Sequence, residues 1–144
     1  MMWVEVTDMT VAQMLARADT ELLAAQFSGE AWERFTHAHL AAVRAAAAVV
    51  AARGRLSRRG APRTVWEMLV TVAPEMSRWA ALFADGARLR AALEAGRFDA
   101  VSVARADQAL CDAEDFVDLV RATALEEWPQ EASHAPRMLA VRAS

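Results

Sequence analysis

Apolar side chains recur at intervals of three and four residues along most of this chain, the spacing that places them on one face of an α-helix. The longest such stretch runs from residue 30 to residue 53 and carries two neighbouring apolar stripes. One comprises Trp32, Phe35, His39, Ala42, Ala46 and Val49, and the other Thr36, Leu40, Val43, Ala47 and Val50. Two stripes indicate contacts on two sides, so this stretch is predicted to be the central helix of a bundle.

Capping and breaking residues set the limits of the first two predicted helices. Asp8 or Thr10 can cap a first helix, because their side-chain oxygens accept hydrogen bonds from its free N–H groups, and this helix is expected to end near Phe27. Ser28 is predicted to cap the central helix, which continues to about Arg53.

A third helix is predicted to begin at Thr64, because Thr64 and Glu67 have the spacing of a capping box. Pro74 interrupts the helical period, since its ring clashes with the preceding turn and its nitrogen carries no proton. A new helical piece is expected to start at Pro74 and to end at Asp85 and Gly86.

The last part of the chain predicts a short connecting helix over residues 87–95 and a long helix from Ser102 to Trp128. Residues 129–144 contain two prolines and no sustained period, so they are expected to form a mobile tail. The predicted fold is therefore all-α, an up-and-down bundle of four to five helices in a single domain spanning residues 1–128.

Composition limits the compartment and the partners. The 144 residues contain no apolar run near the ~18 residues that a membrane span requires, and the N-terminus lacks the features of a secretory signal, so a cytoplasmic protein without membrane contact is expected. The net charge of −3 argues against binding polyanions over the whole surface, although a local basic patch can still attract phosphates. The single cysteine, Cys111, excludes an intramolecular disulfide and is expected to be a packed thiol.

One cluster has the residue types for proton transfer. Arg34, His37 and His39 lie within two turns of the central helix, and an imidazole that moves a proton beside a guanidinium that stabilises an oxyanion supports phosphoryl chemistry without a metal. The structural alternative is that His39, which lies on an apolar stripe, is a hydrogen-bonded core or interface residue, while His37 pairs with Glu33 four residues earlier.

Other classes of site have little support. Two histidines two positions apart point to different faces of a helix, so no metal site is predicted, and no cofactor motif is present. The segment between residues 53 and 63 is an arginine-rich loop, and Arg58, Arg59 and Arg63 are its candidate phosphate contacts. The alternative for this loop is a solvated turn, because all 16 basic residues of the chain are arginines.

The layout as a whole resembles a small subgroup of the HEPN family (higher-eukaryote and prokaryote nucleotide-binding domains) found in high-GC bacteria. The resemblance covers roughly residues 24–120 and rests on three segments: ERFTHAHLAAVRAAAAVVAAR, TVWEMLVTVAPEMSRWAALFADGARLRAALEAG and VARADQALCDAEDFVDLV. It implies a helical bundle that is frequently a dimer. Many members are metal-independent ribonucleases, and others are catalytically silent binding or assembly modules.

Active members of this family carry an Arg, four to six residues and then a His, which dimerisation brings together over the scissile phosphate. Arg34 and His39 match this spacing and are the predicted catalytic pair, although Phe35 stands where a polar residue is usual. The leading hypothesis is a homodimeric HEPN-like domain that binds or cleaves RNA. The alternative is a silent helical module that binds a partner protein or enzyme.

Overall fold

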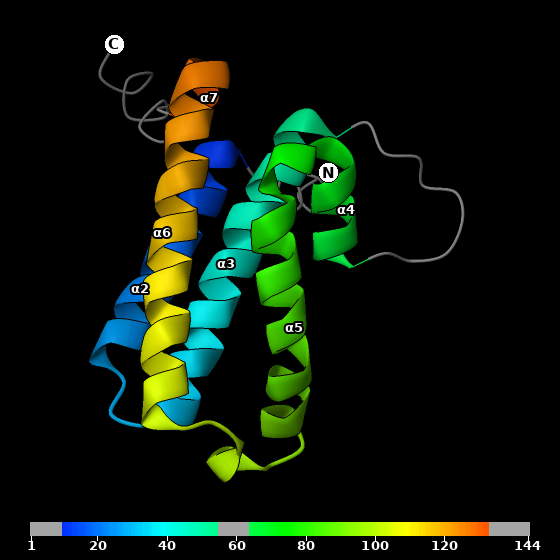
Figure 1. Ribbon diagram of the computed structural model, residues 1–144. Coiled ribbons are helices and arrows are strands. Elements are labelled where there is room, and N and C mark those ends of the chain that lie inside the picture. The colour runs from blue at the N-terminus through cyan, green and yellow to red at the C-terminus, as the bar shows by residue number, and fades with distance from the viewer. Residues whose placement is uncertain (1–9, 55–63, 133–144) are drawn as a thin grey trace, which may run out of the picture.

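The computed structural model describes residues 10–54 and 64–132, and within these ranges the chain forms helices and loops but no strand (Figure 1). The elements are α2 (Val11–Phe27), α3 (Ala31–Arg53), α4 (Val65–Val72), the 3-10 helix η1 (Pro74–Met76), α5 (Ser77–Glu94), the 3-10 helix η2 (Phe98–Ala100), α6 (Val103–Glu127) and α7 (Pro129–Ala132). The predicted all-α bundle is confirmed.

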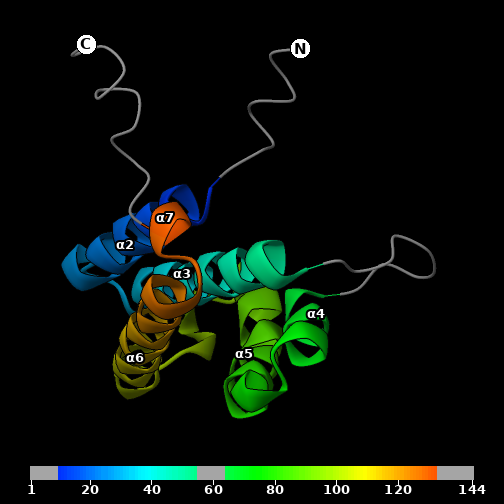
Figure 2. The ribbon, with the colours of Figure 1, turned by 90° about the horizontal axis from the view of Figure 1, so that it is seen from above.

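Helix α3 lies at the centre of the bundle, as its two apolar stripes predict. It contacts α2, α4, α5 and α6, and Figure 2 shows it between the pair α2 and α6 on one side and the pair α4 and α5 on the other. Small side chains allow this close packing, because they let neighbouring helices approach. The fully buried residues of α3 are Ala38, Ala41, Ala42, Ala45, Ala46, Ala48 and Val49.

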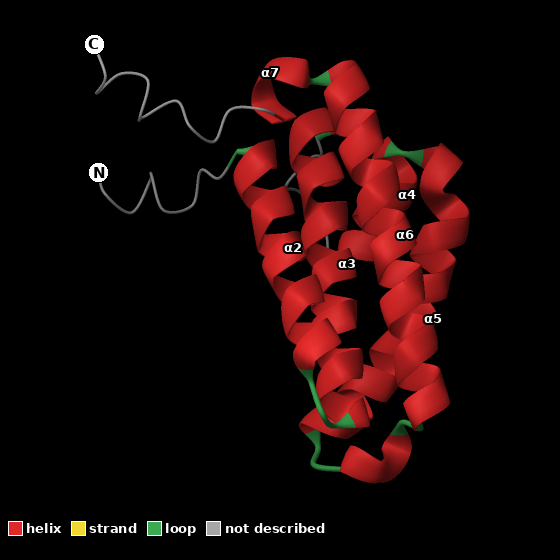
Figure 3. Cartoon of the chain, turned by 90° about the vertical axis from the view of Figure 1, so that its left-hand side faces the viewer, coloured by secondary structure: helices red, strands yellow, loops and turns green. Residues whose placement is uncertain are grey.

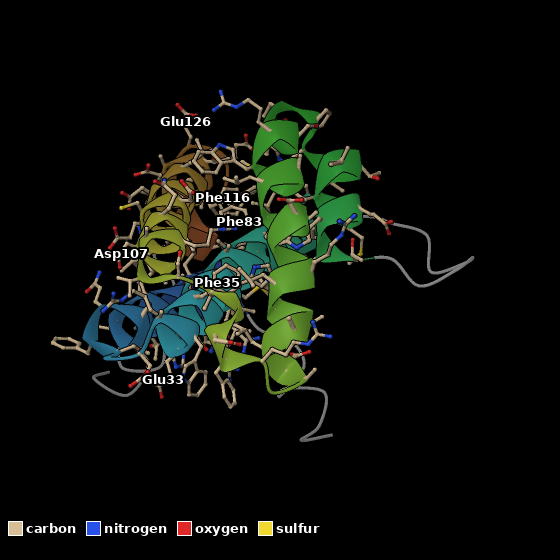
Figure 4. All side chains as sticks on the ribbon, turned by 60° about the horizontal axis from the view of Figure 1, so that its bottom comes forward. Glu33, Phe35, Phe83, Asp107, Phe116 and Glu126 are labelled. Carbon is tan, nitrogen blue, oxygen red and sulfur yellow. The ribbon has the colours of Figure 1, made fainter. Side chains whose placement is uncertain are left out.

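Helices α5 and α6 stand apart, and aromatic side chains from several helices fill the space between them. Phe35, Phe83 and Phe116 point into this space in Figure 4, from α3, α5 and α6 respectively. The rings of Phe83 and Phe116 lie 5.3 Å apart between centroids, and the ring of Trp66 on α4 lies 5.2 Å from that of Phe83. These separations are typical of favourable aromatic pairs, so the cluster joins four helices.

The helix boundaries confirm some of the predicted caps and correct one. Thr10 caps α2 and Thr64 caps α4, each in a capping box with the residue three positions later. Ser28 does not cap α3, because it ends α2 instead: its hydroxyl donates to the carbonyl oxygen of Ala24 at 2.7 Å, and its N–H donates to that of Ala25. The N-cap of α3 is Glu30.

The region after Pro74 differs from the prediction. Pro74 does interrupt the helical period, with the 3-10 turn η1, but α5 then runs unbroken through Asp85 and Gly86, so the predicted helix end and the separate connecting helix are wrong. A glycine ends a helix by adopting a positive φ, and among the described residues Gly96 alone does so, with a φ of 91°. Gly86 keeps helical geometry and is buried inside the bundle.

The described C-terminal residues also depart from the expected tail. Helix α6 ends at Glu127 before Pro129, as predicted, but residues 129–132 form the short helix α7, because proline is well suited to the first position of a helix. Figure 3 shows α7 next to the end of α6. Residues 133–144 and 1–9, and therefore most of the predicted tail and the domain's first residues, lie outside the described ranges.

Helix α3 is the one described helix that is long and apolar enough to cross a membrane by length and composition. Half of its most apolar window is buried inside the protein, and Arg44 interrupts the apolar sequence. Because its contacts are with α2, α4, α5 and α6, the apolar character of α3 is accounted for by its place in the core.

Candidate functional site

His39 is the one buried polar or charged side chain among the described residues, with 5% of its surface exposed. Its ring stacks on that of Phe35, one turn earlier on α3, with 5.9 Å between centroids, and meets the edge of Trp66 on α4 at 6.2 Å. The expected core position is therefore confirmed. The expected hydrogen bond is not found, because His39 makes none with any residue that the structure describes.

Gly86 on α5 faces His39 directly. A Cβ atom added at Gly86 would stand 3.5 Å from Nδ1 of His39 and 3.5 Å from Cζ of Phe35. A glycine in the middle of a helix costs about 1 kcal/mol relative to alanine, so its presence here needs a local reason. The space that its missing side chain leaves is part of a cavity of about 10 Å³ beside His39, roughly the room for one water-sized atom.

A guanidinium faces the same cavity from the opposite helix. Nη2 of Arg105, on α6, lies 3.7 Å from the point where a Gly86 Cβ would stand, and Cζ of Arg105 lies 5.2 Å from the centroid of the Phe35 ring. A cation over an aromatic face is held there by the ring quadrupole. Arg105 forms no ion pair with a carboxylate among the described residues, so its charge is free to meet an anion.

A second, wider depression lies on the other side of His39. It has a volume of about 470 Å³ and is lined by residues of α3, α4 and α5, among them His39, Thr64, Trp66 and Arg90. Nε of Arg90 lies 3.3 Å from Oε2 of Glu94, outside the geometry of a hydrogen bond, so this guanidinium is only partly neutralised. His39 thus lies between two hollows, each with an arginine in its wall.

These surroundings keep His39 neutral. Burial lowers the pKa of His39 most, and the positive charges of Arg90 and Arg105 lower it further, to about 4. A buried imidazolium between two guanidiniums would lack both water and a counter-charge. At neutral pH the ring therefore carries one proton and retains one nitrogen that accepts a hydrogen bond.

The structure places Arg34, the other member of the predicted catalytic pair, in a different environment. Its Nη1 lies 2.7 Å from Oδ1 of Asp107, Nη2 donates to the carbonyl oxygen of Ser28 at 2.7 Å, and Nε donates to that of Ala25 at 3.3 Å. Arg34 therefore joins the end of α2 to α6. Within one chain it makes no described contact with His39, as the offset of five residues around a helix predicts.

The remaining candidates divide between the surface and the residues outside the described ranges. His37 pairs with Glu21 on α2, with 2.7 Å between Nδ1 and Oε1, so the predicted pair with Glu33 is wrong. Cys111 is exposed and not packed as expected. The candidate phosphate contacts Arg58, Arg59 and Arg63 lie outside the described residues, although Thr64, which follows Arg63 directly, lines the wide depression.

Comparison with known protein families agrees with the helical layout. The SAV_6107-like HEPN family model matches residues 25–121, about two thirds of the chain. The chain belongs to this HEPN family. No curated protein and no solved structure matches it.

The HEPN chain brings together residues that sequence spacing did not single out. Arg105, Arg90 and Gly86 surround His39, but they come from helices that are about 50 and 65 residues further along the chain. The sequence signal for this site is Gly86 itself, because a glycine inside a helical period is unfavourable unless packing or function requires it. The sequence predicts a helix end there because an Asp-Gly pair resembles a helix terminus.

Proposed function

We propose that this HEPN domain binds or cleaves RNA as a homodimer, without a metal, and that His39 is the residue that exchanges a proton with the RNA. The observation that carries the proposal is a neutral imidazole without a described hydrogen-bond partner, placed between the guanidiniums of Arg90 and Arg105. Positive charges next to a proton acceptor, with Arg105 lacking a described carboxylate partner and Arg90 only partly neutralised by Glu94, suit a phosphodiester, whose oxygens are negative and whose neighbouring hydroxyl can lose a proton.

The low pKa of His39 in the free protein is compatible with this proposal, because a bound, negatively charged substrate would raise it. A phosphodiester next to Arg90 and Arg105 would offset the two positive charges that lower the pKa of His39. The pKa of the imidazole would then rise toward the neutral range, where proton transfer is most efficient. The site is therefore expected to become active when RNA binds.

The homodimer enters the proposal through Arg34. Its three hydrogen bonds hold it away from His39 of the same chain, so the predicted pair of Arg34 and His39 requires a second copy or a rearrangement at the end of α2. Apolar side chains support an interface at that end of the bundle. The exposed ones there are Leu23, Phe27, Phe98 and Val103, and Phe27 is 83% exposed.

RNA cleavage in EDTA tests the catalytic part of the proposal. His39→Ala is expected to abolish cleavage while the melting temperature falls by only a few degrees, and His37→Ala, the matched change on the same helix, is expected to leave cleavage intact. If wild-type protein retains no RNA even at low salt, the proposal loses its substrate. Sedimentation of wild-type protein at micromolar concentration tests the dimer.

The arginine-rich segment supplies the second test. If Arg58, Arg59 and Arg63 contact phosphates, changing all three to Gln is expected to reduce the slope of log affinity against log salt by about 2, because each phosphate contact on a single strand contributes roughly 0.7. The same three changes are expected to leave the unfolding midpoint unaltered. An unchanged slope would remove these residues from the RNA contact.

The alternative function, a silent module that binds a partner protein, is favoured by the apolar end of the bundle. Phe27 is 83% exposed and Val103 is 63% exposed, and aromatic and aliphatic side chains at this level of exposure are typical of protein interfaces. Binding of a protein partner through this end would respond weakly to salt and would be weakened by Phe27→Ser. RNA binding is expected to fall steeply as salt is added, so the salt dependence separates the two functions, whereas Phe27→Ser is expected to weaken the proposed homodimer as well.

A further inference from the structure

The small cavity beside His39 has the features of a site for a single oxygen atom. Three kinds of group meet there: the buried imidazole of His39, the guanidinium of Arg105, and the bare backbone of Gly86. Among the described residues the imidazole has no hydrogen-bond partner and the guanidinium has no carboxylate partner. His39 is 5% exposed and Arg105 is half-buried, so little water reaches either group, and a ligand that accepts hydrogen bonds from both would be stabilised.

We propose that one oxygen of a phosphate group enters this cavity, where Arg105 and His39 donate hydrogen bonds to it, while the rest of the phosphate stays at the cavity mouth between α5 and α6. A volume of about 10 Å³ admits one oxygen atom but not a whole phosphate. The phosphate is assigned to the backbone of RNA, an assignment that rests on the proposed function.

Gly86 decides whether the oxygen fits. With alanine at this position, the methyl group would stand 3.5 Å from His39 Nδ1 and 3.7 Å from Arg105 Nη2, which are ordinary contact distances. The methyl group would therefore occupy the cavity without forcing the helices apart. Glycine is less favourable than alanine inside a helix, so keeping this space open lowers the stability of α5.

One negative group also lines the cavity. Asp112 on α6 accepts a hydrogen bond at Oδ1 from Nε2 of Gln108 at 3.0 Å, one turn earlier. Its charge opposes an anion, whereas Arg105 in the cavity wall and Arg90 on the far side of His39 favour one. Asp112→Asn is therefore expected to strengthen phosphate binding.

The test uses inorganic phosphate and a short single-stranded RNA as separate probes of the full chain, at constant ionic strength maintained with sodium chloride. Binding is followed by the NMR signals of the His39 ring, and the unfolding midpoint is measured in parallel. In the wild type the His39 signals are expected to shift and saturate with either probe. Gly86→Ala is expected to abolish the shift while the unfolding midpoint stays the same or rises, an outcome that a merely structural role of Gly86 would not produce.

Arg105→Gln is expected to weaken phosphate binding at least about tenfold, and Arg88→Gln, the same change at an exposed position of α5, is expected to have no effect. The proposed site would be overturned by either of two results. Phosphate could still bind to both the Gly86→Ala and the Arg105→Gln variant, or the His39 signals of the wild type could stay unchanged with both probes. If RNA shifts the His39 signals and is cleaved although phosphate binding survives both changes, the proposed function stands without this site. If RNA is cleaved but leaves the His39 signals unchanged, the proposed role of His39 fails together with the site. If phosphate binds here but RNA is neither bound nor cleaved, the site stands and the proposed function fails.

Discussion

Arg34 on α3 holds Asp107 on α6, with 2.7 Å between Nη1 and Oδ1, although the two residues are far apart in the sequence. The same guanidinium donates to the carbonyl oxygens of Ser28 and Ala25 at the end of α2, and that of Ala25 also accepts from the N–H of Ser28. One side chain thus joins the end of one helix, the beginning of the next and the side of a third. A planar fork of five donors is suited to such a junction.

This junction predicts a loss of stability when Arg34 is replaced. Arg34→Gln is expected to lower the free energy of unfolding by about 1 to 3 kcal/mol, because the ion pair with Asp107 and the hydrogen bonds from a charged donor to the carbonyl oxygens of Ser28 and Ala25 are lost. Urea denaturation measures the difference, with Arg88→Gln as the control for a lost surface charge. Unchanged stability together with lost RNA cleavage would contradict the structural role and support the catalytic one.

The bundle was predictable from the sequence because local signals and tertiary contacts agree. The stripe from Phe35 to Val49 is buried, Thr64 forms the predicted capping box, and Pro74 breaks the helical period. Each of these depends on residues within a few positions of one another. Patterns of this kind are visible in sequence because they follow from the helical repeat and from the backbone chemistry of single residues.

The candidate site was only half predictable, because its groups come from three helices. His39 was singled out by its residue type and its place on an apolar stripe. Arg105 and Arg90 are two among 16 arginines, and no spacing relates them to His39 before the helices pack. The sequence predictions for Ser28 and Gly86 are wrong for a related reason, because Ser28 can cap or end either neighbouring helix, and a buried glycine cannot be told from a terminal one without its packing partner.

The close packing of α3 predicts that enlarging a buried alanine is costly. Ala46 is fully buried, so Ala46→Leu is expected to lower the free energy of unfolding by about 1 to 3 kcal/mol through overpacking. Ala47→Leu is expected to cost less, because Ala47 is only partly buried. Ala51→Leu, at an exposed position of the same helix, is the matched control for urea denaturation, and equal midpoints for Ala46→Leu and Ala51→Leu would mean that the core adapts.

The capping box of α4 predicts a smaller effect at Thr64. Its Oγ1 accepts from the N–H of Glu67 at 3.1 Å, and the Glu67 carboxylate accepts from the N–H of Thr64 at 3.1 Å. Thr64→Ala is expected to cost about 1 kcal/mol, because the first turn of this eight-residue helix loses a cap. Thr71→Ala is the control, since the Thr71 hydroxyl only donates within the helix, and a larger loss there in thermal unfolding would contradict the prediction.

The lowered pKa of His39 predicts that acid destabilises the fold. In the unfolded chain His39 binds a proton near pH 6.5, whereas in the folded protein it stays neutral until about pH 4. Between these values the unfolded state binds more protons, so stability is complete above pH 6.5 and falls as the pH decreases toward 4. The contribution lost by pH 4 is about 3 kcal/mol, from the difference between the two pKa values.

Comparing the wild type with His39→Leu isolates this contribution from the titration of the carboxylates, which both proteins share. Urea denaturation at several pH values measures the free energy of unfolding of both proteins. The difference between them is expected to be constant above pH 6.5. Below pH 6.5 the wild type is expected to lose more stability than the leucine variant. His37→Leu is the matched control on the same helix, and this variant is expected to keep the wild-type contribution of His39. A difference that does not change between pH 7 and pH 4 would show that His39 takes up its proton equally well in the folded protein, and that the hollow beside it is open to water.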